Sequence, residues 1–319
     1  MTDIGSVIDV RTTYGNTLVG LGETDERIVV LEADLMKASG SELFLKRFPD
    51  RHFQVGIAEQ NLVGIASGLA AMGKIPFAST FSNFLSQRAC DQVVNSVAFN
   101  IFNVKLCGTY AGLTQEKNGG THIGVEDIAI MRVMPKMVVL APADCTELAA
   151  AMQWAAFYEG PVYLRIPRGP LRTLFGDTYQ FKVGKAVIMS EGTDATIVTS
   201  DITTWEGVQA REALESRGLH IRHLHMPTIK PIDREEILRA ATETGAIVTV
   251  ENHSRLGGLG SAVTEVVCDS CPTLVSRLGM NDRYGETARL GWLLDRHGIS
   301  SAHIVKAVEE ILGRMGGLR

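Results

Sequence analysis

The chain has 319 residues, 45% of them hydrophobic and 21% charged, which is the composition of a soluble globular protein large enough for two domains. Its formal net charge is -5 and its Lys and Arg residues are scattered, so nothing favours nucleic acid or a membrane surface as a partner, whereas small anions remain possible ligands. The sequence has no uninterrupted run of about 18 apolar residues, and its start lacks the basic and apolar stretches of a signal peptide. We expect a cytoplasmic protein.

In the first half of the chain, short β-branched segments alternate with longer segments rich in Ala and Leu. Residues 27–34 predict a strand that ends at Asp34, residues 61–73 predict a helix, and residues 105–112 and 137–144 predict two further strands. This alternation is typical of an α/β fold, in which helices cover both faces of a parallel sheet. Because such sheets bind ligands at the carboxyl ends of their strands, we expect the site in the loops that follow these strands.

A domain boundary is predicted where residues 172–185 interrupt the apolar periodicity with Gly, Asp and Lys. We therefore expect one domain over residues 1–180 and a second over residues 181–319. The second half repeats the pattern of the first, with strands expected at residues 195–200, 219–224, 246–251 and 273–279 and a helix at residues 208–218. The prediction is an α/β protein with two doubly wound, mainly parallel sheets.

Residues 55–73, VGIAEQNLVGIASGLAAMG, carry the first motif. They resemble the glutamate motif of the thiamine-diphosphate enzymes of the transketolase and 2-oxo acid dehydrogenase superfamily. The resemblance implies that Glu59 hydrogen-bonds a ring nitrogen of the cofactor's aminopyrimidine, where a carboxyl proton favours the imino tautomer that deprotonates the thiazolium carbon. On position alone, Glu59 would be a carboxylate that interacts favourably with a helix N-terminus. The surrounding motif favours the catalytic role.

Residues 76–96 resemble the family segment that lines the aminopyrimidine pocket. Phe81 and Phe84 stand at the matching positions, and Gln87 stands where many transketolases have a tyrosine. Two Phe residues three positions apart can share one face of a helical turn, and a flat heteroaromatic ring stacks well on such a surface. A Phe pair in isolation would indicate core packing, so the pocket assignment depends on the distance of this segment from Glu59.

The Gly-Thr-His sequence at residues 120–122 resembles the substrate-histidine loop of transketolases rather than that of their relatives. The resemblance implies that His122 hydrogen-bonds the oxygen atoms of a ketose and helps to move protons as a carbon–carbon bond breaks. Two residues depart from the family pattern. Asn118 replaces an aspartate that recognises the sugar, and Tyr110 replaces a histidine that helps to hold the substrate phosphate. The identity of the substrate therefore stays open.

Two arginines are expected to bind the anionic tail of the substrate. Arg168 matches a phosphate-binding arginine at a strand end in transketolases, and Arg11 is similarly placed near the start of the chain. A guanidinium group suits a tetrahedral oxyanion because it donates paired hydrogen bonds. Arg165 is an alternative, and an isolated arginine would most simply be a solvated charge. By the same resemblance, Asp34 lies near the thiazolium ring, and Ala38–Ser39 occupy the region of another phosphate ligand.

The second half of the chain contains one Gly-rich loop that leads into a helix, a shape that can hold a phosphate. It is also a common tight turn, and transketolases carry a similar stretch away from their active site. We therefore interpret Gly257, Gly258 and Gly260 as structural residues.

Histidines and cysteines of the second half are candidates for metal ligands. His220, His223 and His225 alternate along a predicted strand, which places them on one face, but no further ligand is evident and a surface or interface role is favoured. The five cysteines, an odd number, indicate a reducing compartment. Cys268 and Cys271 form one C-x-x-C pair with no second pair nearby, so we interpret that pair as structural.

One family motif has no counterpart in this chain. Transketolases bind the cofactor diphosphate through Mg²⁺ with a Gly-Asp-Gly segment and a downstream Asn, and the resemblance over residues 5–312 covers only the pyrimidine-binding and C-terminal domains. It therefore implies an N-terminal transketolase subunit as partner, which would hold the Mg²⁺ ion and the diphosphate of thiamine diphosphate. Since the cofactor of this family lies across the interface of the two domain types, the expected assembly is an α2β2 heterotetramer.

The resemblance implies transfer of a two-carbon ketol unit from a ketose to an aldose, with a phosphate or another anionic tail, such as a sulfonate, on the substrate. One alternative is the β subunit of a 2-oxo acid dehydrogenase, which the loop at residues 120–122 disfavours. Another is a non-catalytic regulatory homologue. Glu59, Phe81, Phe84 and His122 disfavour the latter, because a binding module has no need of this set.

Overall fold

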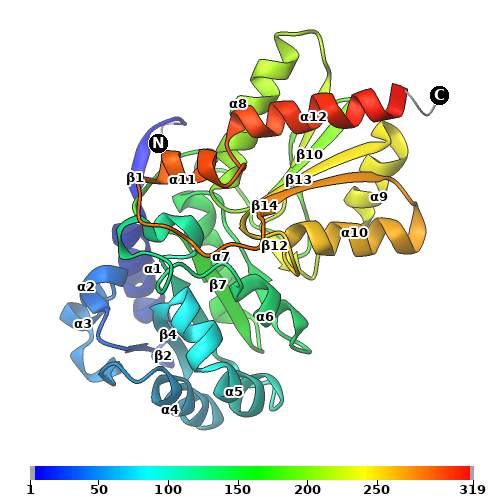
Figure 1. The fold of residues 1–319 in the computed structure, drawn as a ribbon. Helices are drawn as coiled ribbons and strands as arrows, with labels where there is room; N and C mark the ends of the chain where they lie inside the picture. Colours follow the sequence, from blue (N-terminus) through cyan, green and yellow to red (C-terminus); the bar gives the residue numbers. More distant parts are fainter. Residues whose placement is uncertain (1–3, 317–319) are drawn as a thin grey trace.

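The computed structural model describes residues 4–316 and contains two large sheets, each covered by helices, and a small two-stranded sheet. In Figure 1 the first sheet lies in the lower part of the molecule, in blue to green, and the second lies above it, in green to orange. The prediction of an α/β protein with two mainly parallel sheets is confirmed. No helix within the described range is long and apolar enough to cross a membrane.

The first sheet has seven strands in the order β12-β6-β7-β5-β4-β2-β3, and only the edge strand β12 is antiparallel to its neighbour. Its strands are β2 (Ile28–Glu32), β3 (His52–Gln54), β4 (Ile75–Phe81), β5 (Lys105–Thr109), β6 (Val138–Leu140), β7 (Val162–Ile166) and β12 (Thr228–Lys230). The helices and turns around it are α1 (Val10–Thr24), α2 (Met36–Ser39), α3 (Glu42–Arg47), η1 (Pro49–Arg51), α4 (Glu59–Ala71), η2 (Phe84–Arg88), α5 (Cys90–Gln92), η3 (Val93–Ala98), η4 (Gly112–Asn118), α6 (Asp127–Val133) and α7 (Cys145–Phe157).

Helices cover both faces of the first sheet because its strands are apolar on both sides. Tyr14 and Leu18 of α1 pack with Met152 of α7 on one face. Leu62 of α4 and Met131 of α6 pack on the opposite face. Each fully buried large apolar side chain of this kind contributes roughly 1.5 to 3 kcal/mol to stability. The sheet is therefore a rigid support for the loops at its edges.

The second sheet has five strands in the order β14-β13-β10-β11-β9, with β9 antiparallel at the edge. Its strands are β9 (Val187–Ser190), β10 (Ala195–Thr199), β11 (Ile221–His225), β13 (Ala246–Ser254) and β14 (Leu274–Met280). The helices around it are α8 (Thr203–Glu215), α9 (Arg234–Thr244), α10 (Leu259–Ser270), α11 (Leu290–Arg296) and α12 (Ser301–Gly316). All the strands and the helix predicted for this half of the chain are present.

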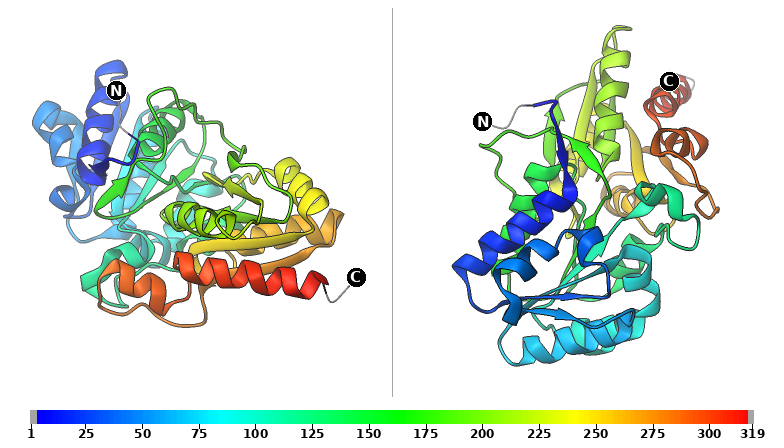
Figure 2. Two further views of the ribbon diagram at one scale, coloured as in Figure 1. Left: turned by 90° about the horizontal axis from the view of Figure 1, so that it is seen from above. Right: turned by 90° about the vertical axis from the view of Figure 1, so that its left-hand side faces the viewer.

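Two pairings cross between distant parts of the chain. β1 (Val7–Asp9) pairs with β8 (Pro170–Arg172) in an antiparallel sheet, and Figure 2 shows this blue N-terminal strand beside the green segment that it pairs with. β12 follows three strands of the second sheet in sequence, yet it pairs with β6 of the first sheet. The segment between Arg172 and Val187 contains no helix or strand, as the predicted interruption at residues 172–185 suggests.

A buried ion network joins the two halves of the molecule. The Arg165 guanidinium on β7 is paired with Asp127 through Nε at 2.9 Å, with Asp201 through Nη1, and with the Asn252 carbonyl through Nη2 at 2.8 Å. Asp201 and Asn252 belong to the second half of the chain, and the guanidinium is fully buried. We call these four residues the Arg165 network. The alternative that Arg165 binds a substrate anion is wrong, because its donors are all directed at partners inside the protein.

Candidate active site

The residues predicted to form the site lie mainly at the carboxyl edge of the first sheet. In the parallel register, Phe81 at the end of β4 is level with Thr109 at the end of β5, and Thr109 is level with Ile166 at the end of β7. Tyr110 therefore follows one of these strand ends directly, and Arg168 follows another two residues later. Three segments far apart in sequence thus reach one edge, as the location of binding sites in parallel sheets predicts.

Glu59 is the first residue of α4, as the sequence predicts. Its side chain is almost fully buried, with 4% of the residue exposed. No side chain caps this helix at Ala58, so the carboxylate lies near free backbone N–H groups, whose dipole favours a negative charge. One carboxylate oxygen accepts a hydrogen bond from Arg88 Nη1 at 3.1 Å. The guanidinium thus compensates a carboxylate that is buried at the start of the helix.

Four rings form an aromatic cluster beside Glu59: Phe81, Phe84, Tyr110 and His122. The centroid of Phe81 lies 5.7 Å from that of Phe84 and 4.9 Å from that of Tyr110. His122 meets Phe84 edge-on at 5.1 Å and Phe81 at 6.1 Å. The expectation that Phe81 and Phe84 share a helical turn is wrong, because Phe81 ends β4 and Phe84 begins the π-helical turn η2. They nevertheless lie in contact, as the pocket hypothesis requires.

The loop that carries His122 is fixed by several hydrogen bonds. Asn83 Nδ2 donates to the Thr121 carbonyl at 2.8 Å, and Thr121 Oγ1 lies 3.0 Å from His122 Nδ1. Gly120 is required here because a Cβ atom would come within 2.7 Å of the Gly285 carbonyl oxygen. These contacts orient the imidazole, whose pair with Thr121 leaves Nε2 for a ligand.

The two arginines expected to bind an anion come from segments that the structure joins. Val10 N donates to the Gly169 carbonyl at 3.4 Å, within the junction made by β1 and β8. Arg168 lies over the Tyr110 ring at 4.9 Å and donates to the Gln115 carbonyl at 3.0 Å. Arg11, with a half-exposed side chain, is 3.6 Å from its neighbour Asp9. Whether both guanidinium groups bind one ligand stays a prediction.

Tyr110 and Asn118 border the same region. The Tyr110 hydroxyl donates to the Ala38 carbonyl at 3.0 Å, and Asn118 Nδ2 donates to Gln115 Oε1 at 3.2 Å. Ser39 does not point to a ligand, because its hydroxyl donates to Glu32 Oε1 at 2.5 Å. Burial raises the pKa of this Glu32 carboxyl to about 7, so a buried, readily protonated group lies beneath the loop.

Asp34 and Gln87 are exposed at two other places along the edge. Asp34 follows β2 with a positive φ of 61°, and its backbone N–H donates to Gln54 Oε1 at 2.6 Å. Gln87 Nε2 donates to Glu126 Oε2 at 3.2 Å. Their assignment to a cofactor stays a prediction.

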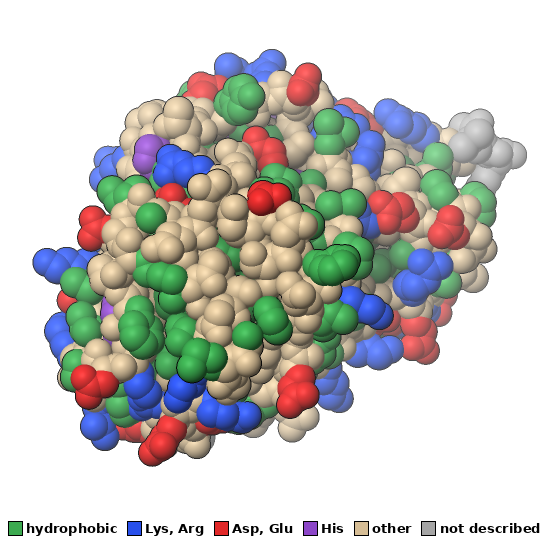
Figure 3. Space-filling model, turned by 90° about the horizontal axis from the view of Figure 1, so that it is seen from below, with side chains coloured by type: hydrophobic (Ala, Val, Ile, Leu, Met, Phe, Trp, Pro, Cys, Tyr) green, Lys and Arg blue, Asp and Glu red, His purple; other side chains and the backbone are tan. Residues whose placement is uncertain are grey.

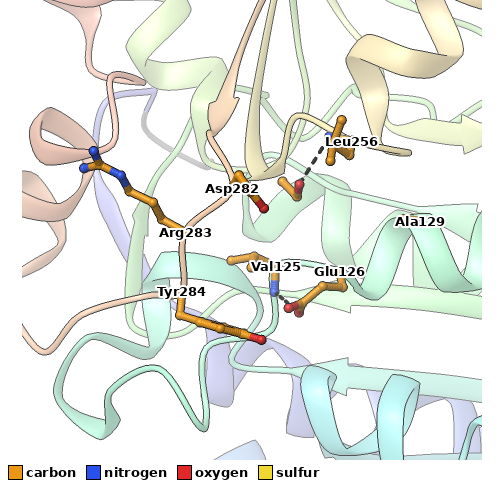
Figure 4. A pocket seen from close by; sticks show the side chains of 8 residues that line it. Val125, Glu126, Ala129, Leu256, Asp282, Arg283 and Tyr284 are labelled. Atoms are coloured by element: carbon orange, nitrogen blue, oxygen red, sulfur yellow. Dashed lines mark hydrogen bonds between the residues drawn. The ribbon is translucent and has the colours of Figure 1, made fainter.

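Two pockets that share Glu126 and Tyr284 in their linings were not predicted. One, of about 410 Å³, is lined by Asn83, Gln87, Gly120, Thr121, Ile123, Glu126 and Tyr284. The other is shown in Figure 4, where the Glu126 carboxylate accepts a hydrogen bond from the Val125 N–H and the exposed Tyr284 ring lies below them. Tyr284 and Glu126 border both pockets. No sequence signal indicates Tyr284, because its position depends on how the second half of the chain packs.

The Gly-rich loop of the second half is structural, as expected. The buried Glu251 carboxylate accepts hydrogen bonds from Leu259 N at 2.7 Å and Gly260 N at 2.9 Å, so it fills the place where a phosphate would lie. A Cβ atom on Gly258 would collide with this carboxylate.

The histidines of β11 have no metal site around them. His223 Nε2 bonds Thr199 Oγ1 at 2.8 Å, and burial lowers the pKa of His223 to about 3. His225 contacts Glu147 of the first half at 2.6 Å, so it has the interface role that the sequence left open, and a surface role is wrong for both. Among residues 4–316, no three His, Cys, Asp or Glu side chains are grouped to hold a metal ion. Cys268 and Cys271 are free thiols.

The residues at this edge fit the aminopyrimidine ring of thiamine diphosphate. The flat guanidinium of Arg88 lies 3.9 Å from the centroid of the Phe84 ring while it hydrogen-bonds Glu59. A flat, hydrogen-bonding group can therefore contact both residues at once. Arg88 was not predicted, although its position four residues after Phe84 on a helical segment was the available signal.

Comparison with known proteins extends over both halves of the chain. Residues 6–173 match the transketolase pyrimidine binding domain, and residues 184–304 match the transketolase C-terminal domain. The 6-deoxy-6-sulfo-D-fructose transketolase subunit SqwH of Clostridium sp. (strain MSTE9) is 43% identical over 96% of this chain and 95% of its own length. A putative transketolase C-terminal section of Methanocaldococcus jannaschii is 41% identical over 94% of this chain and 95% of its own length. Among solved structures, a split gene transketolase described as an inactive beta4 tetramer has a TM-score of 0.88 and 43% identity, and the match covers 96% of this chain and 98% of that one.

Proposed function

This chain belongs to the transketolase family and is a homologue of the C-terminal subunit of split transketolases, and we propose that it transfers a two-carbon ketol unit from a ketose to an aldose with thiamine diphosphate. The observation that carries the proposal is that one residue, Arg88, contacts both Glu59 and the Phe84 ring, which in turn meets His122. The family alternatives, a 2-oxo acid dehydrogenase subunit and a regulatory homologue, are not better supported by the relatives found.

Glu59 is proposed to hold the proton that activates the cofactor ring. When bound, thiamine diphosphate supplies a carbon nucleophile and stores the electrons of the bond that breaks. Glu59 is suited to its role because its carboxyl is buried at a helix N-terminus, next to the stacking face of Phe84. His122 is proposed to donate a proton to, and accept one from, the substrate oxygens through Nε2. The rings of Phe81 and Phe84 lie against the imidazole and are proposed to limit the access of water to it.

The anionic tail of the substrate is proposed to bind at Arg11 and Arg168, with Tyr110 and Asn118 shaping the pocket. The hydroxyl and amide there are neutral, and they replace a histidine and an aspartate of many transketolases. The named relative from Clostridium acts on a 6-sulfo sugar, so a sulfonate is a candidate tail beside a phosphate. Both are tetrahedral oxyanions that accept paired hydrogen bonds from guanidinium groups.

An N-terminal transketolase subunit is proposed as the partner, in an α2β2 assembly located in the cytoplasm. It would hold the Mg²⁺ ion and the cofactor diphosphate. Support comes from exposed apolar side chains on α4 and η3, which are in contact, and on the residues beside them: Ile57, Ile65, Met72, Val94 and Phe99, which we call the α4–η3 face. Figure 3 views the molecule from below, where hydrophobic side chains are spread over the surface and most charged side chains lie near its edges. Exposed apolar surface of this kind marks contact with another protein.

The partner hypothesis is tested by calorimetry with thiamine diphosphate and Mg²⁺. The isolated chain should bind the cofactor weakly, and a subunit that carries a Gly-Asp-Gly segment with a downstream Asn should restore tight binding. Phe99→Asp should weaken the assembly, whereas Phe157→Asp, which changes another exposed Phe at the end of α7, should not. Tight Mg²⁺-dependent binding by the isolated chain would refute the split site.

The reaction is tested by incubating the reconstituted pair with ketose donors that carry a phosphate, a sulfonate or no charge, each with a panel of aldose acceptors. We expect a shortened aldehyde and a lengthened ketose from donors with an anionic tail. Decarboxylation of a 2-oxo acid without ketol transfer would instead favour the dehydrogenase alternative.

A further inference from the structure

Arg88 makes the two contacts that the cofactor ring would need. Its guanidinium lies over the face of Phe84 at 3.9 Å, and its Nη1 donates to Glu59 Oε1 at 3.1 Å. These are the stacking surface and the hydrogen-bonding carboxyl proposed for the aminopyrimidine. A guanidinium resembles that ring in being flat, in stacking on aromatic faces and in presenting N–H donors at its edge.

The guanidinium and an aminopyrimidine cannot occupy this position together. A distance of 3.9 Å from the ring centroid is close to van der Waals contact, so no second flat group fits between Arg88 and Phe84. The Glu59 side chain is only 5% exposed, so its carboxyl cannot turn away to meet a ring elsewhere. Entry of the cofactor ring therefore requires Arg88 to leave.

Arg88 is able to leave because it is weakly held. Its side chain is 52% exposed, and within residues 4–316 Glu59 is its sole ion-pair partner and Phe84 the sole ring beneath it. The half-exposed guanidinium regains water when it leaves, whereas the buried Glu59 carboxylate then needs another hydrogen-bond donor, which the ring would supply. The long side chain starts at the end of η2 and can extend into solvent without a change of backbone.

We propose that Arg88 is a placeholder, which fills the aminopyrimidine position in the cofactor-free subunit and swings out when the ring binds. The proposal rests on the proposed function, because it assumes that the ring stacks on Phe84 and meets Glu59. In the empty subunit the guanidinium covers the Phe84 face and compensates the buried charge of Glu59. It also makes cofactor binding weaker than the pocket alone would allow.

The test uses the whole chain and the free aminopyrimidine fragment, 4-amino-5-hydroxymethyl-2-methylpyrimidine, titrated by ligand-observed NMR. Arg88→Met should bind the fragment about five- to thirtyfold more tightly than the unchanged chain, because the competing ion pair and stacking contact are gone. Arg88→Lys should lie between the two, since it keeps the charge and loses the flat group. The matched control is Arg47→Met, which removes an exposed Arg that pairs with Glu23 and lies over Phe48, and it should change nothing.

Salt provides a second readout. Added KCl should raise the affinity of the unchanged chain for the neutral fragment, because it screens the pair of Arg88 with Glu59, and should leave Arg88→Met unaffected. Equal or weaker binding by Arg88→Met overturns the placeholder and makes Arg88 a positioning residue or a bystander. If no variant binds the fragment and the reconstituted pair does not bind thiamine diphosphate, the proposed function fails as well. If the pair binds the cofactor but Arg88→Met equals the unchanged chain, only the placeholder fails.

Discussion

Two arginine–carboxylate groups in this molecule have the same chemistry and opposite surroundings. Arg88 pairs with Glu59 at the candidate site, and its side chain is 52% exposed. Arg165 pairs with Asp127 and Asp201 between the two halves of the chain, and its side chain is fully buried. The burial of each arginine follows from its position. Arg88 lies at the end of a helical turn at the surface, and Arg165 lies on a strand in the central part of the first sheet.

The difference in burial decides what each group can do. Removing one partner of a buried pair leaves an uncompensated charge, which costs roughly 3 to 5 kcal/mol, so the Arg165 network is fixed. In the Arg88–Glu59 pair only the carboxylate is buried, so the half-exposed Arg88 can exchange its place with another hydrogen-bond donor. Because Arg165 is buried, a ligand cannot reach its guanidinium. An arginine near a strand end at a predicted site therefore need not bind an anion.

The largest expected effect is on catalysis and comes from the open pair. Glu59→Gln should lower the activity of the reconstituted pair by about 10²- to 10⁴-fold, because the amide cannot supply a carboxyl proton. Unfolding by urea should change little, since Arg88 can extend into solvent. Steady-state kinetics on the cofactor-saturated pair of subunits measure the activity. Circular dichroism is the control for folding. Near-normal turnover would eliminate the proposed role.

The fixed pair should show the reverse behaviour. Arg165→Met should destabilise the chain by roughly 3 to 5 kcal/mol, because Asp127 and Asp201 would remain buried without a cation. Urea unfolding measures this loss. The control is Arg217→Met, whose exposed pair with Glu309 on α12 should contribute less than about 1 kcal/mol. A loss of similar size for the two variants would contradict the contrast between fixed and open pairs.

A buried carboxyl without a cation sharpens the comparison. Glu32 accepts hydrogen bonds from Ser39 and Ser41, and burial raises its pKa from 4.5 to about 7 in the folded chain. A raised pKa stabilises the fold below pH 4.5, and that stability is lost as the pH rises to about 7.

The corresponding experiment compares urea unfolding of the unchanged chain and Glu32→Gln across this range. The unchanged chain should lose roughly 3 kcal/mol relative to the variant between pH 4.5 and pH 7. Glu23→Gln, which alters an exposed carboxyl, is the control and should show no such slope. A constant difference between the unchanged chain and Glu32→Gln would mean that the carboxyl stays ionised.

The smallest effect is expected for binding of the substrate tail. Arg168→Ala should raise the KM for substrates with an anionic tail about ten- to a hundredfold and spare neutral substrates, because it removes charge-assisted hydrogen bonds. Arg172→Ala is a matched control, since that arginine also lies over an aromatic ring, Trp205, and donates to a backbone carbonyl, that of Gly5. If Arg168→Ala weakened both kinds of substrate equally, Arg168 would be a structural residue.

Patterns local in the sequence predicted most of the fold. The buried strands β2, β5 and β10 and helix α4 lie where apolar periodicity and turn residues indicate them, because those signals come from the segment itself. Glu59 was placed correctly at a helix start for the same reason. Phe81 was placed wrongly in a helical turn. It ends β4, and a strand that leads directly into a π-helical turn has no simple periodicity.

Features that depend on packing between segments escaped prediction. Arg88 and Arg165 look alike in sequence, and only the tertiary structure distinguishes the half-exposed one from the buried one. His223 lies in β11, which has a neighbouring strand on each side, and it is buried, whereas the sequence left a surface or an interface role open. Tyr284 reaches the pockets through the docking of the second half, which no local pattern encodes.

The return of β12 to the first sheet affects how the chain could be divided. A protease that cut between Phe175 and Gly184 would nick the polypeptide without releasing two separate bodies, because the C-terminal fragment would still supply the edge strand beside β6. One apolar core, with Met131 from one side of the cut and Met226 and Ile229 from the other, would also keep the fragments associated. Expressed alone, the N-terminal fragment would expose the open edge of β6 to other chains, so it should aggregate where the nicked protein stays soluble.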